Sequence, residues 1–202
     1  MGNILASFLS WLFNWQDTVI ISEEDVLKQL QSSHTFSWCI YRKRDIIRHV
    51  GFVLIFDEEP FCTVDFTVEN PSAPCLVGCP SKVLIQRVPT DFEDGVERGK
   101  DIQRLETQGD YCRQRAEKII RKLVTPNQEN YSLLFHNCRH NTREVVNQVC
   151  DSGLCGENVE DARQMLLRTE REDKLIVLSI ISQLAAALDI MLSLALKRLL
   201  TT

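Results

Sequence analysis

Apolar and polar positions form two kinds of pattern in this chain, one in each half. Between residues 35 and 88, runs rich in β-branched and aromatic residues alternate with polar turns, which is typical of strands. The four predicted strands are TFSWCIYRK, RHVGFVLIF, FCTVDFTV and KVLIQRV. Beyond residue 110 the apolar positions follow helical spacing, in YCRQRAEKIIRKLV, CRHNTREVVNQVC and GENVEDARQMLLRT. Strands that precede helices, rather than alternating with them, predict an α+β fold.

The remaining segments of the central region add one helix and several connections. SEEDVLKQLQ predicts a helix ahead of the strands, with Ser22 as its N-cap and Asp25 as the partner in a capping box. DEEP is a polar turn, residues 69–81 are a proline-rich loop, and residues 89–110 are polar and irregular. Polar and apolar residues alternate in FCTVDFTV, so we expect a strand with one face buried and the other in solvent.

The N-terminal end of the chain is unusually apolar. On a helix, the side chains of Asn3, Ser7, Ser10 and Asn14 fall on one narrow polar stripe. This favours a helix over residues 1–16 that lies in a membrane interface, over a helix packed on the domain. Gly2 also permits N-myristoylation, although Ala6 stands where the usual motif has Ser or Thr.

The C-terminal end predicts a hydrophobic helix over residues 174–200. Between Lys174 and Lys197 lie 22 residues, of which 17 are apolar. As a helix they span roughly 33 Å, about the thickness of a bilayer core, so we expect a membrane anchor. The alternatives are an amphipathic helix in the membrane plane and a helix that meets a partner helix through the face bearing Asp189.

Charge and cysteine content narrow the class of protein. The net charge of −5 argues against non-specific nucleic-acid binding, because there is no excess of cations to neutralise phosphates. The eight cysteines are scattered, without the spacing of a disulfide framework or of zinc knuckles, and no secretory signal precedes them. We therefore expect one domain over residues 22–160, in a reducing intracellular setting with mostly free thiols.

The stretch YSLLFHNCRHNTREVV carries the strongest candidate chemistry. If a helix begins after HN, Asn137 is its N-cap and Cys138 its first residue. A helix N-terminus stabilises an anion, so we expect the pKa of the Cys138 thiol to be lowered. A nucleophilic thiol also needs a general base, and His49 begins a predicted strand, a rigid element suited to holding one. The other histidines are His34, His136 and His140.

Two other interpretations of Cys138 compete with a nucleophile. One is an ordinary buried cysteine with no chemical role. The other is zinc, which the spacing does not favour: His136, Cys138 and His140 do not share one face of a helix. A second possible zinc set is irregularly spaced and consists of Cys75, Cys79, Cys150 and Cys155. We therefore expect neither a metal nor a cofactor.

The motif Asn137-Cys138-Arg139-His140-Asn141 follows a strand pair, IYRKRDIIRHVGFVLIF, in which His49 begins the second strand. This order resembles the lecithin–retinol acyltransferase (LRAT) family and its small phospholipase A and acyltransferase relatives, which are circularly permuted papain-like cysteine hydrolases. The motif of that family is Asn-Cys-Glu-His-Phe, and its catalytic His begins the second strand. The resemblance covers roughly residues 22–155, includes the 89-residue separation of His49 from Cys138, and implies an antiparallel sheet packed against helices.

The resemblance also implies a site and a function. The second His of the family ends the next strand, and Asp65 falls at the matching place here, so a Cys138–His49–Asp65 triad is expected; a solvent-facing Asp65 is the alternative. The implied function is a membrane-associated lipid acyltransferase or phospholipase A, which acts on a phospholipid or other lipid ester through an acyl-thioester on Cys138. The domain would face the cytoplasm. A cysteine peptidase of the same superfamily and an inactive membrane adaptor are the alternatives.

Overall fold

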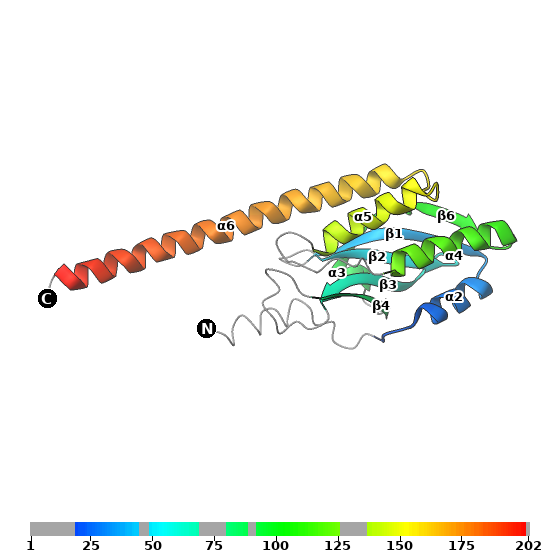
Figure 1. The fold of residues 1–202 in the computed structure, drawn as a ribbon, viewed down its shortest axis with the longest axis horizontal. Helices are drawn as coiled ribbons and strands as arrows, with labels where there is room; N and C mark the ends of the chain where they lie inside the picture. The colour runs from blue at the N-terminus through cyan, green and yellow to red at the C-terminus, as the bar shows by residue number, and fades with distance from the viewer. Residues whose placement is uncertain (1–18, 45–48, 69–79, 89–91, 126–136, 201–202) are drawn as a thin grey trace. The chain divides into compact units, whose positions relative to one another are not determined.

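The computed structural model describes residues 19–44, 49–68, 80–88, 92–125 and 137–200 (Figure 1). The chain divides into two compact units, Met1–Leu166 and Leu167–Thr202. The interfacial helix predicted for residues 1–16 lies outside the described residues, as does most of the loop predicted at 69–81.

A six-stranded antiparallel sheet organises the first unit (Figure 1). Its strands are β1 Thr35–Lys43, β2 Val50–Phe56, β3 Glu59–Val68, β4 Ser81–Arg87, β5 Val96–Arg98 and β6 Gln103–Glu106. They lie in the order β4-β3-β2-β1-β5, and β6 pairs with a different part of β1. Every pairing among the described strands is antiparallel. The predicted α+β class, with an antiparallel sheet and helices, is confirmed.

The helices are α2 Glu23–Ser32, α3 Phe92–Gly95, α4 Asp110–Val124, α5 Cys138–Asp151 and α6 Val159–Leu200. The capping box predicted for the first of them is confirmed, because the backbone N–H of Ser22 donates to Asp25 Oδ2 at 3.0 Å and that of Asp25 donates to Ser22 Oγ at 3.2 Å. The prediction that residues 89–110 are irregular is wrong, since α3, β5 and β6 lie there. These elements have three or four residues each, too few for a hydrophobic period to show.

Both faces of the sheet carry apolar clusters. One face packs against α2, α4, α5 and the start of α6, with Phe36, Trp38, Phe52 and Leu54 among its buried side chains. The opposite face has a smaller cluster, made by Cys39, Tyr41, Val53, Ile55, Phe92 and Val96. The expectation that β3 exposes one face is therefore wrong: residues 62–66 are all buried, including Thr63 and Asp65. Two polar side chains of this strand thus lie in the interior.

A two-residue turn joins β2 to β3 and contributes to their register. Asp57 and Glu58 occupy it with φ of 50° and 71°, the left-handed pair that tight hairpins require. The carboxylate of Asp57 accepts hydrogen bonds from the N–H groups of His34 at 2.8 Å and Thr35 at 2.9 Å, which ties the turn to the start of β1. The resulting register pairs Phe52 with Val64, next to Asp65.

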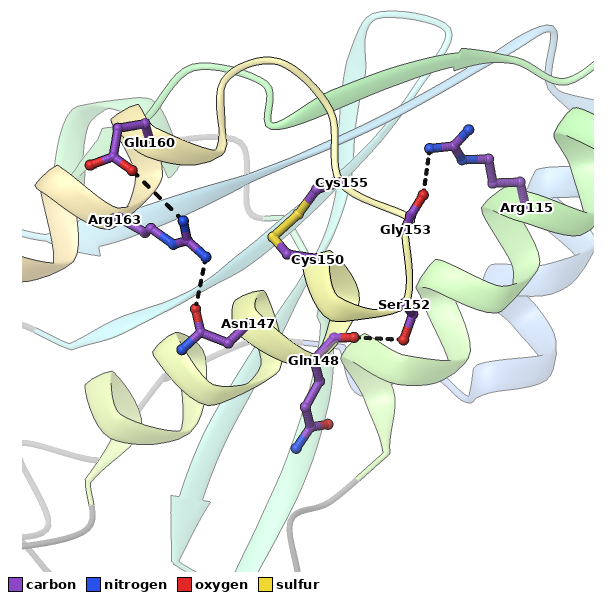
Figure 2. Close-up of a disulfide and its surroundings, with 9 residues drawn as sticks. All are labelled: Arg115, Asn147, Gln148, Cys150, Ser152, Gly153, Cys155, Glu160 and Arg163. Carbon is purple, nitrogen blue, oxygen red and sulfur yellow. Dashed lines mark hydrogen bonds and ion pairs between the residues drawn. A yellow bond between two sulfur atoms is a disulfide. The ribbon is translucent and has the colours of Figure 1, made fainter.

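The C-terminal end of α5 is closed by a disulfide that the sequence analysis did not predict. Cys150 and Cys155 are bonded, and the chain between them turns at Gly153, whose φ is 69° (Figure 2). The guanidinium of Arg115 on α4 donates to the carbonyl oxygen of Gly153 at 3.1 Å. The helix end predicted at 151–153 is confirmed, whereas the expectation of free thiols is wrong for this pair. The free cysteines of the described part of the chain are Cys39, Cys62, Cys112 and Cys138.

The third predicted helix of the domain and the hydrophobic helix predicted over residues 174–200 belong to one continuous element, α6. Among the residues that the structure describes, no helix combines the length and the apolar character needed to cross a membrane. The membrane anchor at residues 174–200 stays a prediction.

Candidate active site

Cys138 is the first residue of α5, as predicted, and Asn137 is the N-cap. Asn137 has an extended backbone, and its side-chain oxygen accepts hydrogen bonds from the N–H groups of Arg139 at 3.1 Å and His140 at 3.4 Å. The cap fixes the helix start, so the thiol sits at the positive end of the helix dipole. Cys138 is buried, with 6% of its surface exposed.

The side chains of His49 and Asp65 lie together. His49 directly precedes β2, and its Nε2 lies 2.7 Å from Oδ1 of Asp65, which is on β3. The side chains are 15% and 2% exposed, so the solvent-facing alternative for Asp65 is wrong. Because a carboxylate accepts the proton of Nε2, the nitrogen left for other partners is Nδ1. His49 interacts with Cys138 both by charge and by a side-chain hydrogen bond.

The charges of Cys138, His49 and Asp65 shift the pKa values of Cys138 and His49. Burial alone would raise the pKa of the Cys138 thiol, but the charge and hydrogen bond of His49, the backbone N–H of Val50 and the charge of Arg139 outweigh it, and the pKa is lowered from 9.0. Burial alone would lower the pKa of His49, but the Cys138 thiolate and the Asp65 carboxylate raise it to about 10. The lowered pKa of Cys138 and the raised pKa of His49 both favour a thiolate–imidazolium pair.

The other buried thiols of the described chain behave differently. Burial raises the pKa of Cys39 to about 12 and raises that of Cys62 as well. Both side chains are fully buried and lie in apolar clusters of the sheet. Cys138 thus differs from an ordinary buried cysteine of this same fold.

Two hydroxyl groups that were not predicted from the sequence hold Asp65. The hydroxyl of Tyr41 on β1 donates to Asp65 Oδ1, and that of Thr63 donates to Oδ2 at 2.9 Å. Gly51 lies between them on β2: a methyl group there would stand 2.8 Å from Tyr41 Cε1 and 2.8 Å from the carbonyl oxygen of Val64, and would collide with Asp65 Oδ1. A glycine inside an apolar strand marks such a close approach, and the run VGFVLIF offered that signal.

The remaining histidines differ in their surroundings. His140 is exposed, with its Nδ1 3.3 Å from the guanidinium of Arg143. His34 is also exposed, and its Nδ1 lies 3.2 Å from the side-chain nitrogen of Gln108. His136 lies outside the described residues. The histidine that the structure shows in interaction with Cys138 is His49.

The residues considered for zinc do not form a site in the described part of the chain. No group of three or more potential ligands gathers among the described residues. The all-cysteine set is ruled out in the observed state because Cys150 and Cys155 are bonded to each other and have no thiolate to offer. Cys75 and Cys79 lie outside the described residues.

No family model, curated protein or solved structure matches this chain.

The start of α5 also offers a donor for a negatively charged oxygen. Of its first N–H groups, those of Arg139 and His140 bond to the side chain of Asn137, and that of Asn141 bonds to the Asn137 carbonyl at 3.1 Å. Among the residues that the structure describes, the N–H of Cys138 has no acceptor. An N–H beside a nucleophilic sulfur is suited to stabilising the oxyanion of a tetrahedral intermediate. Thiolate, imidazolium, carboxylate and amide donor together suit acyl transfer.

Proposed function

We propose that the chain is a cysteine-dependent acyl-transfer enzyme that forms an acyl-thioester on Cys138. The observation that carries this proposal is the Cys138–His49–Asp65 arrangement, which joins the start of a helix to two strands. A low-pKa thiol, an imidazole whose far nitrogen is bonded to a carboxylate, and that buried carboxylate are the three parts of a nucleophilic triad.

The reaction follows from the charges. The thiolate of Cys138 attacks the carbonyl carbon of an ester, and the electron pair of the C=O bond moves to the oxygen, which accepts a hydrogen bond from the Cys138 N–H. When the intermediate collapses, the alcohol leaves with the proton of the His49 imidazolium. Water, or an acceptor amine or alcohol, then attacks the thioester while neutral His49 takes its proton. The thiolate leaves, and the imidazolium is regenerated.

A lipid ester is the substrate that we assign to this site. The order of the functional residues supports it: His49 comes before Cys138 along the chain, as in the permuted papain-like enzymes of the LRAT family, which the motifs of this sequence resemble. The apolar segments at residues 1–16 and 174–200 support it as well, since they suit contact with a membrane. The proposed setting is the cytoplasmic face of an intracellular membrane.

The test is to trap the acyl-enzyme. The full chain is mixed with vesicles of phosphatidylcholine and phosphatidylethanolamine and quenched in acid, and the modified peptide is identified by mass. We expect one acyl group on Cys138. Cys138→Ala and His49→Ala should abolish the adduct. Cys112→Ala and His140→Ala are matched controls that should keep it, because Cys112 lies on α4 and His140 is exposed.

Two outcomes would contradict the proposal. An adduct that forms with peptide-derived electrophiles and never with vesicles would make the protein a cysteine peptidase instead of a lipid enzyme. A Cys138 that reacts no faster with iodoacetamide at pH 7 than a thiol of ordinary pKa would mean that the site is inactive, as in an adaptor that keeps only the fold.

A further inference from the structure

Three strands converge on the carboxylate of Asp65. Tyr41 on β1 is paired with Gly51 on β2, and Asp65 follows Val64, the β3 partner of Phe52. These residues therefore form one row across the sheet. Because Gly51 has no side chain, the ring of Tyr41 crosses above it and its hydroxyl reaches Asp65 Oδ1. Thr63, two residues earlier on β3, points to the same face and bonds to Oδ2.

The two hydroxyl groups offset the cost of burying the carboxylate of Asp65. A carboxylate that is 2% exposed loses its water, and burying a charge is costly unless hydrogen bonds and an opposite charge replace that water. His49 supplies the opposite charge only while it is protonated, and its protonation changes during acyl transfer. The hydroxyls of Tyr41 and Thr63 are neutral donors whose hydrogen bonds do not depend on the state of His49.

We propose that Tyr41 and Thr63 are positioning residues of the active site, which keep the carboxylate of Asp65 aimed at His49 throughout the reaction. This inference rests on the proposed function and adds two residues that orient Asp65. Donors on both oxygens leave the carboxylate no freedom to rotate, so Oδ1 stays where Nε2 of His49 meets it. Each residue donates a hydrogen bond to the carboxylate of Asp65. Each acts through Asp65.

The measured quantity is the pH midpoint of Cys138 alkylation by iodoacetamide, which reports the pKa of the thiol and needs no substrate. The titratable and charged groups that interact with this thiol are His49 before β2, Arg139 on α5 and Tyr41 on β1. Asp65 acts in turn on His49 and on Tyr41. Alkylation at Cys138 is separated from that at other cysteines by peptide mass. Cys39 and Cys62 react slowly, because burial raises their pKa.

The experiment is a double-mutant cycle of wild type, Tyr41→Phe, Asp65→Asn and the double variant. In the native background, Tyr41→Phe should raise the Cys138 midpoint by about one pH unit, since a hydrogen bond to a charged group is lost and the support of the imidazolium weakens. In the Asp65→Asn background the same change should leave the midpoint within about 0.2 units, because Tyr41 then has no carboxylate through which to act.

Further variants separate positioning from structural damage. Thr63→Val should raise the midpoint, while Thr63→Ser, which keeps the hydroxyl, should restore it. Thr107→Val is the matched control: it removes another fully buried hydroxyl, which bonds to the backbone of Ser33, and it should leave the midpoint unchanged. Tyr41→Phe keeps the aromatic ring, so its packing with Phe92 is retained.

Three results would overturn the inference. They are a midpoint that is unchanged or lower in Tyr41→Phe, an equal shift in the Asp65→Asn background, and a shift of the same size in Thr107→Val. A wild-type midpoint at the ordinary 9.0 would instead overturn the proposed function together with this inference. A lowered wild-type midpoint without coupling would overturn the inference alone.

Discussion

Gly51→Ala tests the tightest contact of the site, because the added methyl group has nowhere to go. It would stand 2.8 Å from Tyr41 Cε1 and 2.8 Å from the carbonyl oxygen of Val64, whereas unstrained contacts are about 3.5 Å or longer. The carbonyl oxygen belongs to Val64 of β3, which is paired with Phe52 of β2, and the ring of Tyr41 is fully buried. Neither neighbour can move without disturbing the sheet.

The change in the free energy of unfolding that we expect for Gly51→Ala is the balance of two opposing effects. Overpacking a well-packed interior costs about 1–3 kcal/mol. Replacing glycine by alanine restricts the unfolded chain and returns about 0.4–1 kcal/mol, since position 51 lies in a strand without a positive φ. We therefore expect Gly51→Ala to lower the free energy of unfolding by roughly 1–2 kcal/mol. We also expect a raised alkylation midpoint of Cys138, because Tyr41 and Asp65 are pushed apart.

Urea unfolding of the full chain measures the first effect, and Gly95→Ala is its control. No atom lies within 4 Å of a methyl group at position 95, so that variant should be as stable as wild type or slightly more stable. The reasoning is refuted if Gly51→Ala matches Gly95→Ala in stability and also leaves the Cys138 midpoint unchanged. Such a result would mean that the row of Tyr41, Gly51 and Asp65 is loosely packed.

Three further predictions concern the triad and the disulfide. Asp65→Asn should reduce the single-turnover rate of Cys138 acylation by roughly 100-fold, which is less than the 10⁴-fold loss in a serine triad because the pKa of the thiol is already lowered. Asp65→His should recover part of that loss. Equal rates in wild type and both variants would mean that the site is a Cys138–His49 dyad. The acyl-transfer rate should rise with pH through the lowered pKa of Cys138 and then stay level. Above about pH 10 the rate should fall, because His49 loses the proton that the leaving group needs. A rate that keeps rising past that pH would contradict the role of the imidazolium. Cys150→Ser should lower the free energy of unfolding by about 2 kcal/mol, because the disulfide closes a short loop, and urea unfolding measures this loss. The same variant should leave the alkylation of Cys138 unchanged, because the disulfide lies at the other end of α5.

The features that local sequence determines were predictable. Asn137 caps a helix through bonds to residues two and three positions ahead, so the place of Cys138 could be derived from a few neighbouring letters. Strands β1 to β4 are long enough for their composition to show. By contrast, β5 and β6 are too short, and the Cys150–Cys155 bond was missed because scattered cysteines and the absence of a signal sequence favoured free thiols.

The partnership of His49 with Cys138 had another source. The two residues are 89 positions apart, and no periodicity connects them. Their pairing was predicted because a histidine at the start of a strand suits a general base, and because the chain resembles a known family. Tyr41 and Thr63 were missed for a related reason. In a strand pattern they look like ordinary tyrosine and threonine, and their role depends on the register of three strands, which tertiary pairing determines.

The junction of His49 and Val50 has a mechanical consequence. The imidazole of His49 and the backbone N–H of Val50 both act on the sulfur of Cys138. Because the two residues are consecutive in the chain, these two groups move together. Sliding or fraying of the first residues of β2 removes both from Cys138 at once, and the thiol then reverts to the raised pKa that burial imposes. The reactivity of the sulfur thus reports directly whether the first residues of β2 are in register.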